Sequence, residues 1–227
     1  MALILNIDTA TDTASICLAK DGEVLLLLNN DQQKDHASWL HVGIQKMMQQ
    51  SKLGLSDLDA LAVTIGPGSY TGLRVGLASA KGICYALNKP LITLNTLLVM
   101  ANAAADVLKH SFGENTDLLC PMIDARRMEV FTAIYNFNLE TIKEPAALIV
   151  DENSFEDLLK SGCIYFFGNG SEKLKGILKN TKAIFSQVTF DAGTMAKQAE
   201  KYYLRQDFAD LAYTEPLYLK EFFTITR

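Results

Sequence analysis

The sequence predicts an α/β protein built from two duplicated lobes, each a mixed sheet with helices. Three observations support this prediction. Apolar stretches of strand length alternate with amphipathic stretches of helix length along the 227 residues. In each half an apolar strand leads into an aspartate and a hairpin, at Asp8 and at Asp124. Further along each half, a Gly-x-Gly-Ser turn follows an apolar strand and precedes a helix, at residues 66–69 and 168–171.

The individual elements follow from local patterns. Residues 2–7 form a buried strand, and residues 15–28 form a hairpin around Asp21-Gly22, a favoured two-residue turn. Asp35 is expected to cap a helix through residue 51. The remaining elements of the first half are a strand over 60–65, a helix over about 70–87 and a strand over 91–95.

The second half repeats this order with a strand ending at Asp124 and an alternating strand over 129–135. We therefore expect an N-terminal lobe of residues 1–100 with dimerisation helices, and a C-terminal lobe of residues 101–227. The last helix of the C-terminal lobe is expected to be able to pack back on the N-terminal lobe. A duplicated lobe that starts with a hairpin is the organisation of the actin-like ATPase (ASKHA) fold, in which two related lobes face a nucleotide cleft.

Composition restricts the function classes. The net charge of −5 lacks the basic footprint of a protein that holds nucleic acid by itself, so a nucleic-acid role would need a partner. Basic spots such as Arg126-Arg127 are expected to be solvated. Apolar runs are too short to span a bilayer, so no membrane insertion is expected. The four cysteines form no C-x-x-C pair and predict reduced thiols in a cytoplasmic protein: Cys17, Cys84, Cys120 and Cys163.

The glycine-rich turn "GPGSYTGLRVG" does not match the usual phosphate loops. Its glycines are spaced one residue too widely for a dinucleotide fingerprint, and Pro67 removes a backbone N–H. No Lys-Ser or Lys-Thr follows as in a P-loop, and Gly68 adjoins Ser69 directly, which excludes a Gly-x-Ser-x-Gly elbow. No catalytic residue is therefore assigned to this turn.

A histidine metal site is not expected either. His36 and His41 are five residues apart, which separates them by about 140° on a helix. His110 stands alone in a loop-like segment. Surface and capping roles are expected for all three histidines, and no metal ligand is assigned.

Asp8 and Asp124 are the candidates for a nucleotide cleft, where they would hold Mg²⁺. However, "DTATDTAS" offers no glycine for a close approach of the backbone to phosphate, and "DARRME" places two arginines there. We therefore expect a vestigial cleft without a tightly bound cofactor, to which ATP and Mg²⁺ bind only weakly or within a complex.

The helices offer an alternative function, which is docking. One apolar stripe on the helix over 36–50 leaves Trp39 and Val42 outside it, which indicates a second apolar surface. On the next helix, Gly72, Gly76 and Ala80 form a smooth ridge at i, i+4 and i+8. This ridge can pack against a partner or against the chain's own sheet, and the sequence leaves both open.

Four segments resemble the TsaB (YeaZ) family of bacterial tRNA threonylcarbamoyladenosine biosynthesis proteins: "LILNIDTATDTASICL", "GPGSYTGLRVGLASAKG", "DARRMEVFTAIY" and "EPLYLK". The resemblance covers almost the whole chain. It implies a non-catalytic scaffold subunit, which pairs with the catalytic TsaD and with the ATPase TsaE to modify adenosine 37 of ANN-decoding tRNAs. It also implies a homodimer when the chain is alone, and tRNA contact only through the complex.

The resemblance implies a pairing surface on two helices, formed by Trp39, Leu40, Ile44, Met47, Tyr70, Leu73, Gly76, Leu77 and Ala80. The sequence departs from the family at "DARRME", where forms like "DARMGE" are usual, so any role of that turn is in doubt. The alternative hypothesis is an ATP-dependent phosphotransferase that acts on a small molecule through Asp8 and Asp124. Calorimetry with ATP on the isolated chain discriminates the two hypotheses.

Overall fold

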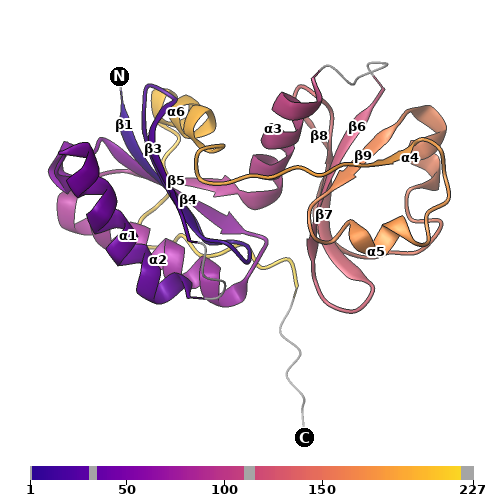
Figure 1. Ribbon diagram of the computed structural model, residues 1–227, viewed down its shortest axis with the longest axis horizontal. Coiled ribbons are helices and arrows are strands. Elements are labelled where there is room, and N and C mark those ends of the chain that lie inside the picture. The colour runs from indigo at the N-terminus through magenta and orange to yellow at the C-terminus, as the bar shows by residue number, and fades with distance from the viewer. Residues whose placement is uncertain (1, 31–34, 110–115, 221–227) are drawn as a thin grey trace, which may run out of the picture. The chain divides into compact units, whose positions relative to one another are not determined.

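A computed structural model of the chain describes residues 2–30, 35–109 and 116–220, which fall into two compact units (Figure 1). Unit 1 comprises residues 1–99 and 190–217, and unit 2 comprises residues 100–189 and the end of the chain. The first boundary lies inside helix α3 (Thr96–Leu108). Residues 190–217 thus belong to unit 1. The sequence pattern assigned them to the C-terminal lobe, with a last helix able to pack back on the N-terminal lobe.

The sheet of unit 1 has five strands in the order β3-β2-β1-β4-β5. Strands β1 and β2 pair antiparallel, as do β2 and β3, whereas β4 and β5 continue the sheet parallel to β1. Side chains on β1 are buried along its length because helices cover both faces of the sheet. The strands are β1 (Leu3–Asp8), β2 (Ser15–Lys20), β3 (Glu23–Asn29), β4 (Ala60–Gly66) and β5 (Leu91–Asn95).

The sheet of unit 2 repeats this plan in the order β8-β7-β6-β9-β10. Its hairpin strands are antiparallel and its last two strands are parallel to β6, so β6 corresponds to β1 and β9 to β4. The strands are β6 (Leu118–Asp124), β7 (Glu129–Tyr135), β8 (Thr141–Ile149), β9 (Ile164–Phe167) and β10 (Ala183–Phe185). The short helices α4 (Glu156–Ser161) and α5 (Glu172–Lys175) belong to this unit. The predicted duplicated α/β fold with mixed sheets is confirmed.

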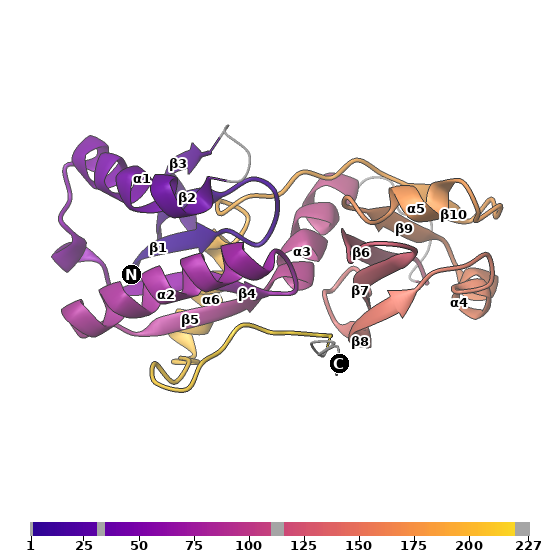
Figure 2. The ribbon, with the colours of Figure 1, turned by 90° about the horizontal axis from the view of Figure 1, so that it is seen from below.

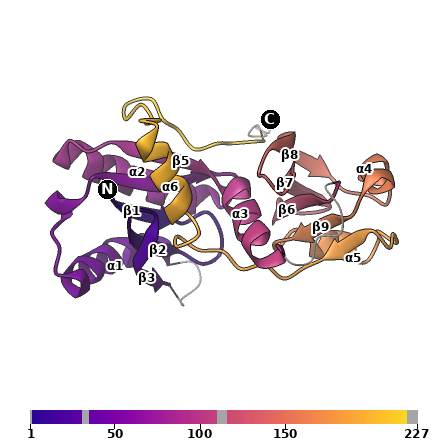
Figure 3. The same cartoon turned by 90° about the horizontal axis from the view of Figure 1, so that it is seen from above.

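In unit 1, helices α1 (His36–Ser51) and α2 (Tyr70–Leu87) lie side by side on one face of the sheet, and α6 (Ala196–Leu204) lies on the other (Figures 2 and 3). A core cluster on the α1–α2 side includes Leu5, Ile16, Leu40 and Leu77. The core on the α6 side is built from smaller residues, such as Ala62 and Ala199. A 3₁₀ turn, η1 (Leu55–Asp57), follows α1.

The helix ends differ in one detail from expectation. Ser69 caps α2, since its hydroxyl accepts a hydrogen bond from the Gly72 N–H at 3.3 Å. Asp35 precedes α1 but makes no such cap, because its carboxylate accepts a hydrogen bond from the Ser38 hydroxyl instead. Within the part of the chain that the structure describes, no helix has the length and apolar character needed to cross a membrane.

Candidate protein-interaction surface on helices α1 and α2

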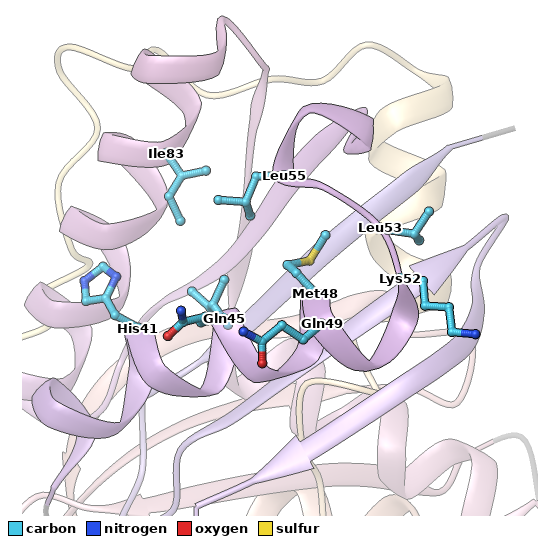
Figure 4. Close-up of a pocket in the computed structure, with 9 residues that line it drawn as sticks. His41, Gln45, Met48, Gln49, Lys52, Leu53, Leu55 and Ile83 are labelled. Carbon is cyan, nitrogen blue, oxygen red and sulfur yellow. The ribbon is translucent and has the colours of Figure 1, made fainter.

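A groove of about 510 Å³ opens between α1, α2 and η1 (Figure 4). Met48 of α1, Ile83 of α2 and Leu55 of η1 point toward this hollow from three sides. The polar groups lie along α1 and include Gln45 and Gln49. An apolar groove with a polar rim on a helix pair is the kind of surface that receives a partner's side chains.

A hydrogen bond joins the two helices at one end of the groove. His41 Nε2 of α1 and Ser79 Oγ of α2 are 3.1 Å apart. Neither this partner of His41 nor the groove positions of Met48, Ile83 and Leu55 were predicted from the sequence. Each of these three apolar positions belongs to a helix face that also contributes to the core, so sequence spacing does not separate the two roles.

The outer face of α2 is formed by small residues that the chain itself does not cover. Ala78, Gly82 and Ala86 are exposed and stand four residues apart, on one side of the helix. A side chain at Gly82 would meet no atom of the chain within 4 Å. Glycine inside a helix is less favourable than alanine by about 1 kcal/mol. Contacts within the chain therefore do not explain the glycine at this position.

Aromatic and charged groups flank this small-residue stripe. Tyr70 is 41% exposed, and the Arg74 guanidinium lies 4.2 Å from the centre of its ring. At the other end of the helix, Tyr85 is 82% exposed. We call the groove together with the stripe and these flanking residues the α1–α2 surface.

The residues assigned from the sequence lie largely beneath this surface. Trp39 is half-buried and packs over Gly43 against the core, and Tyr70 is exposed. The other seven are buried within unit 1: Leu40, Ile44, Met47, Leu73, Gly76, Leu77 and Ala80. Ile44 nevertheless lines the groove. The remaining six support the two helices from below, so we place the rest of the contact surface on their outward neighbours.

The ridge of small residues on α2 packs against the chain itself. A side chain at Gly72 would lie 2.1 Å from the Thr9 carbonyl oxygen, and one at Gly76 would lie 2.3 Å from Thr9 Oγ1. Gly68 is equally close to Ala10, whose carbonyl accepts the Ser69 N–H at 2.7 Å. The glycines therefore admit the turn that follows β1, and the question left open by the sequence is answered in favour of internal packing.

Asp8 sits under this turn and is almost completely buried. Its Oδ1 accepts hydrogen bonds from the Thr64 hydroxyl at 2.6 Å and the Ala10 N–H at 3.1 Å. Burial raises the pKa of this carboxyl from 3.8, and this effect outweighs the two hydrogen bonds, which lower the pKa. His36 is also buried nearby, with Nε2 2.8 Å from the Thr11 carbonyl, in place of the surface position expected for it.

Asp124 of unit 2 has a different environment. It is exposed, and its Oδ1 accepts a hydrogen bond from Lys173 Nζ at 2.6 Å, which is the main cause of its lowered pKa. Among the described residues, no group of three histidine, cysteine or acidic side chains could hold a metal ion. His110 lies outside the described residues. The two aspartates therefore differ in environment: Asp8 is a buried carboxyl, and Asp124 is a carboxylate paired with a lysine.

Comparisons with known proteins place the chain in a family. The family model described as "TsaD: tRNA N6-adenosine threonylcarbamoyltransferase" matches residues 29–214. Curated relatives named tRNA threonylcarbamoyladenosine biosynthesis protein TsaB include one from Escherichia coli, 36% identical over 132 residues, which are 58% of this chain and 54% of the relative. One from Haemophilus influenzae is 34% identical over 128 residues, or 56% of this chain and 51% of the relative. The TsaB protein of Buchnera aphidicola subsp. Schizaphis graminum is 31% identical over 160 residues, which are 70% of this chain and 73% of the relative. The chain belongs to the TsaB (YeaZ) family.

The solved structures agree with this assignment at the level of the fold. YeaZ from Pseudomonas aeruginosa has a TM-score of 0.81 and 21% identity, over 96% of this chain and 100% of that one. The present chain spans about half the length of the E. coli and H. influenzae TsaB proteins that it matches. The family and the fold of the chain are thus shown.

The raised pKa of Asp8 can be tested through the pH dependence of the stability of the chain. Because its pKa is raised in the folded state, the folded chain binds the proton more tightly than the unfolded chain. The stabilisation from this proton is present below the ordinary pKa of 3.8 and is lost as the pH rises through the raised value. Asp8→Asn keeps an acceptor oxygen for Thr64 and Ala10 without the buried charge. We expect urea unfolding to show this variant at least as stable as wild type at pH 7, with less loss of stability between pH 4 and pH 7.

A large loss of stability in Asp8→Asn at pH 7 would mean instead that the folded chain needs the charged carboxylate. Asp124→Asn is the matched control, since its carboxylate is exposed and its pKa is shifted downward. Asp124→Asn should lose as much free energy of unfolding between pH 4 and pH 7 as the wild type does.

Proposed function

We propose that this chain is a non-catalytic partner subunit in the threonylcarbamoylation of adenosine 37 in ANN-decoding tRNAs. In this role it pairs with the catalytic subunit TsaD, works with the ATPase TsaE, and meets tRNA through the complex. The observation that supports the proposal best is the α1–α2 surface, whose groove and exposed Gly82 have no occupant within the described residues of unit 1. The names of the TsaB relatives and of the matching TsaD family model support the pathway.

The shape of the α1–α2 surface suits a helical partner. Ala78, Gly82 and Ala86 leave α2 without projecting side chains over two turns, so a second helix can approach its backbone closely. The groove next to the stripe has apolar walls that can receive large apolar side chains from that helix. Gln45 and Gln49 at its edge can supply polar contacts around such an anchor.

The same proposal includes the absence of a tightly bound cofactor. The turn after β1 packs against Gly68, Gly72 and Gly76, so Thr9 and Ala10 of the chain itself occupy the space beside these three glycines. Asp8 below this turn is buried with a raised pKa, which disfavours a charged Mg²⁺ ligand. ATP and Mg²⁺ would then bind weakly or only in the complex, and TsaD would perform the transfer.

Reconstitution with the cognate TsaD tests this function. We expect the isolated chain to form a homodimer through the α1–α2 surface, and added TsaD to replace one copy and give a heterodimer. Light scattering coupled to gel filtration would measure both species. With TsaE, tRNA and the remaining substrates supplied, formation of threonylcarbamoyladenosine should require this chain. The proposal fails if no complex with TsaD forms, or if the modification proceeds equally well without the chain.

A further inference from the structure

The turn between β6 and β7 has an unusual backbone for its residues (Figure 1). Arg126 and Arg127 have φ angles of 69° and 48°, in the left-handed region. Two hydrogen bonds of 3.1 Å close the turn, from the Ala125 N–H to the Glu129 carbonyl and from the Glu129 N–H to the Arg126 carbonyl. Glycine, asparagine and aspartate adopt such backbone at lower cost than arginine. The preference of the turn therefore does not explain two adjacent arginines.

Neighbouring charges do not explain them either. Lys173 donates hydrogen bonds to Asp124 Oδ1 at 2.6 Å and to the Glu129 carbonyl at 2.7 Å. The carboxylate of Glu129 forms an ion pair with Lys220. Both acidic side chains at the base of the turn are thus already matched by a lysine.

The two guanidinium groups are left uncompensated. Arg126 and Arg127 are exposed, and neither guanidinium forms an ion pair or hydrogen bond with a residue that the structure describes. This local excess of positive charge stands on a chain whose net charge is −5. Met128 beside them is 43% exposed and adds an apolar contact. A planar guanidinium offers paired donors that match the oxygens of a phosphate group.

We propose that the Arg126–Arg127 turn is a binding site for phosphate groups, supplied by the backbone of an RNA chain. Two neighbouring fork-shaped donors at the tip of an exposed hairpin suit successive phosphates of a flexible strand. A free nucleotide presents the same chemistry and is separated from RNA in the test below. The site lies in unit 2 and would give the chain a direct contact with RNA, in addition to the indirect one that the proposed function places in the complex. It does not depend on the α1–α2 surface of unit 1, so either proposal can fail alone.

Fluorescence anisotropy of the full chain with a labelled, unmodified tRNA transcript tests the site over a series of salt concentrations. The variant Arg126→Asn/Arg127→Gly removes both guanidinium groups and supplies residues suited to the turn, so its melting temperature should equal or exceed that of wild type. We expect RNA binding weaker by about tenfold or more, and a plot of log affinity against log salt whose slope is smaller by about 1.4 for two lost phosphate contacts.

The double variant Lys179→Gln/Lys197→Gln is the matched control, because it removes the same charge from exposed positions elsewhere. It should bind RNA with nearly the wild-type salt dependence. A parallel titration with ATP identifies the source of phosphate: ATP binding that needs the two arginines, without RNA binding that needs them, would assign the site to a nucleotide. Equal RNA binding by the two double variants, with ATP binding unaffected by either, or no binding by wild type, would overturn the site.

Discussion

Replacement of Gly72 by alanine is expected to lower the free energy of unfolding by about 3 kcal/mol, as overpacking at a rigid contact does. The new methyl carbon would lie 2.1 Å from the Thr9 carbonyl oxygen and 3.2 Å from the His36 ring. Relief requires α2 to move away from the turn, which also breaks the 2.8 Å hydrogen bond from the Thr9 hydroxyl to the Gly72 carbonyl. Urea unfolding followed by circular dichroism would measure the change.

Gly82→Ala provides the matched control on the same helix. It adds the same methyl group where no atom of the chain lies within 4 Å, so it should raise the free energy of unfolding by about 0.5–1 kcal/mol. One chemical change should thus have opposite effects ten residues apart. If Gly72→Ala unfolds at the same urea concentration as wild type, the close packing of the turn on α2 is wrong.

Gly82→Arg is expected to weaken the complex with TsaD by a factor of about 30 or more, since loss of a central contact costs about 2–4 kcal/mol. Within a single copy of the chain the arginine would extend from the outer face of α2 without a clash, and arginine is a better helix former than glycine. The same substitution should also weaken the proposed homodimer. Stability should therefore be retained while close approach of a partner helix is blocked. Isothermal titration calorimetry with the cognate TsaD would measure the loss.

Gly176→Arg is the appropriate control for this experiment. Gly176 lies in unit 2 and is exposed, and a side chain there would likewise meet no atom of the chain within 4 Å. The same substitution there should leave the affinity for TsaD unchanged. Equal affinities of Gly82→Arg and wild type would remove the stripe from the proposed contact. Charges at Leu73 or Leu77 are poorer probes, because both side chains are in the core and their replacement would unfold unit 1.

The order of elements was predictable from the sequence because each rests on local chemistry. The helix from His36 to Ser51 follows from its apolar stripe, and the Asp21-Gly22 hairpin from its turn residues. The two Gly-x-Gly-Ser turns indicated a duplication, which the matching strand orders of the two sheets confirm. The return of residues 190–217 to unit 1 depends on contacts between distant segments, so the sequence offered it only as an option for the last helix.

The resemblance to the family implied a surface on the same two helices, but most of the residues assigned to it lie on the inner sides of the helices. Ile44 and Tyr70 are the assigned residues that belong to the α1–α2 surface. On α2 two rows of small residues have the same four-residue spacing, one through Gly72 and Gly76 and one through Ala78 and Gly82. Spacing alone does not distinguish a row facing the core from one facing solvent. Leu73 and Leu77 adjoin the first row, and their burial turns that row inward. The turn after β1 supplies the atoms that fill it.

Unit 1 contains both the beginning of the chain and a segment near its end. The isolated bridge between Leu91 and Ala209, and the 2.7 Å hydrogen bond from the Leu217 N–H to the Ile65 carbonyl, tie that late segment to β5 and β4. During synthesis on the ribosome, the strands of unit 1 are therefore made long before the segment that completes their packing. Residues 100–189 emerge in between, so the strands of the unit 2 sheet are all available before unit 1 can close.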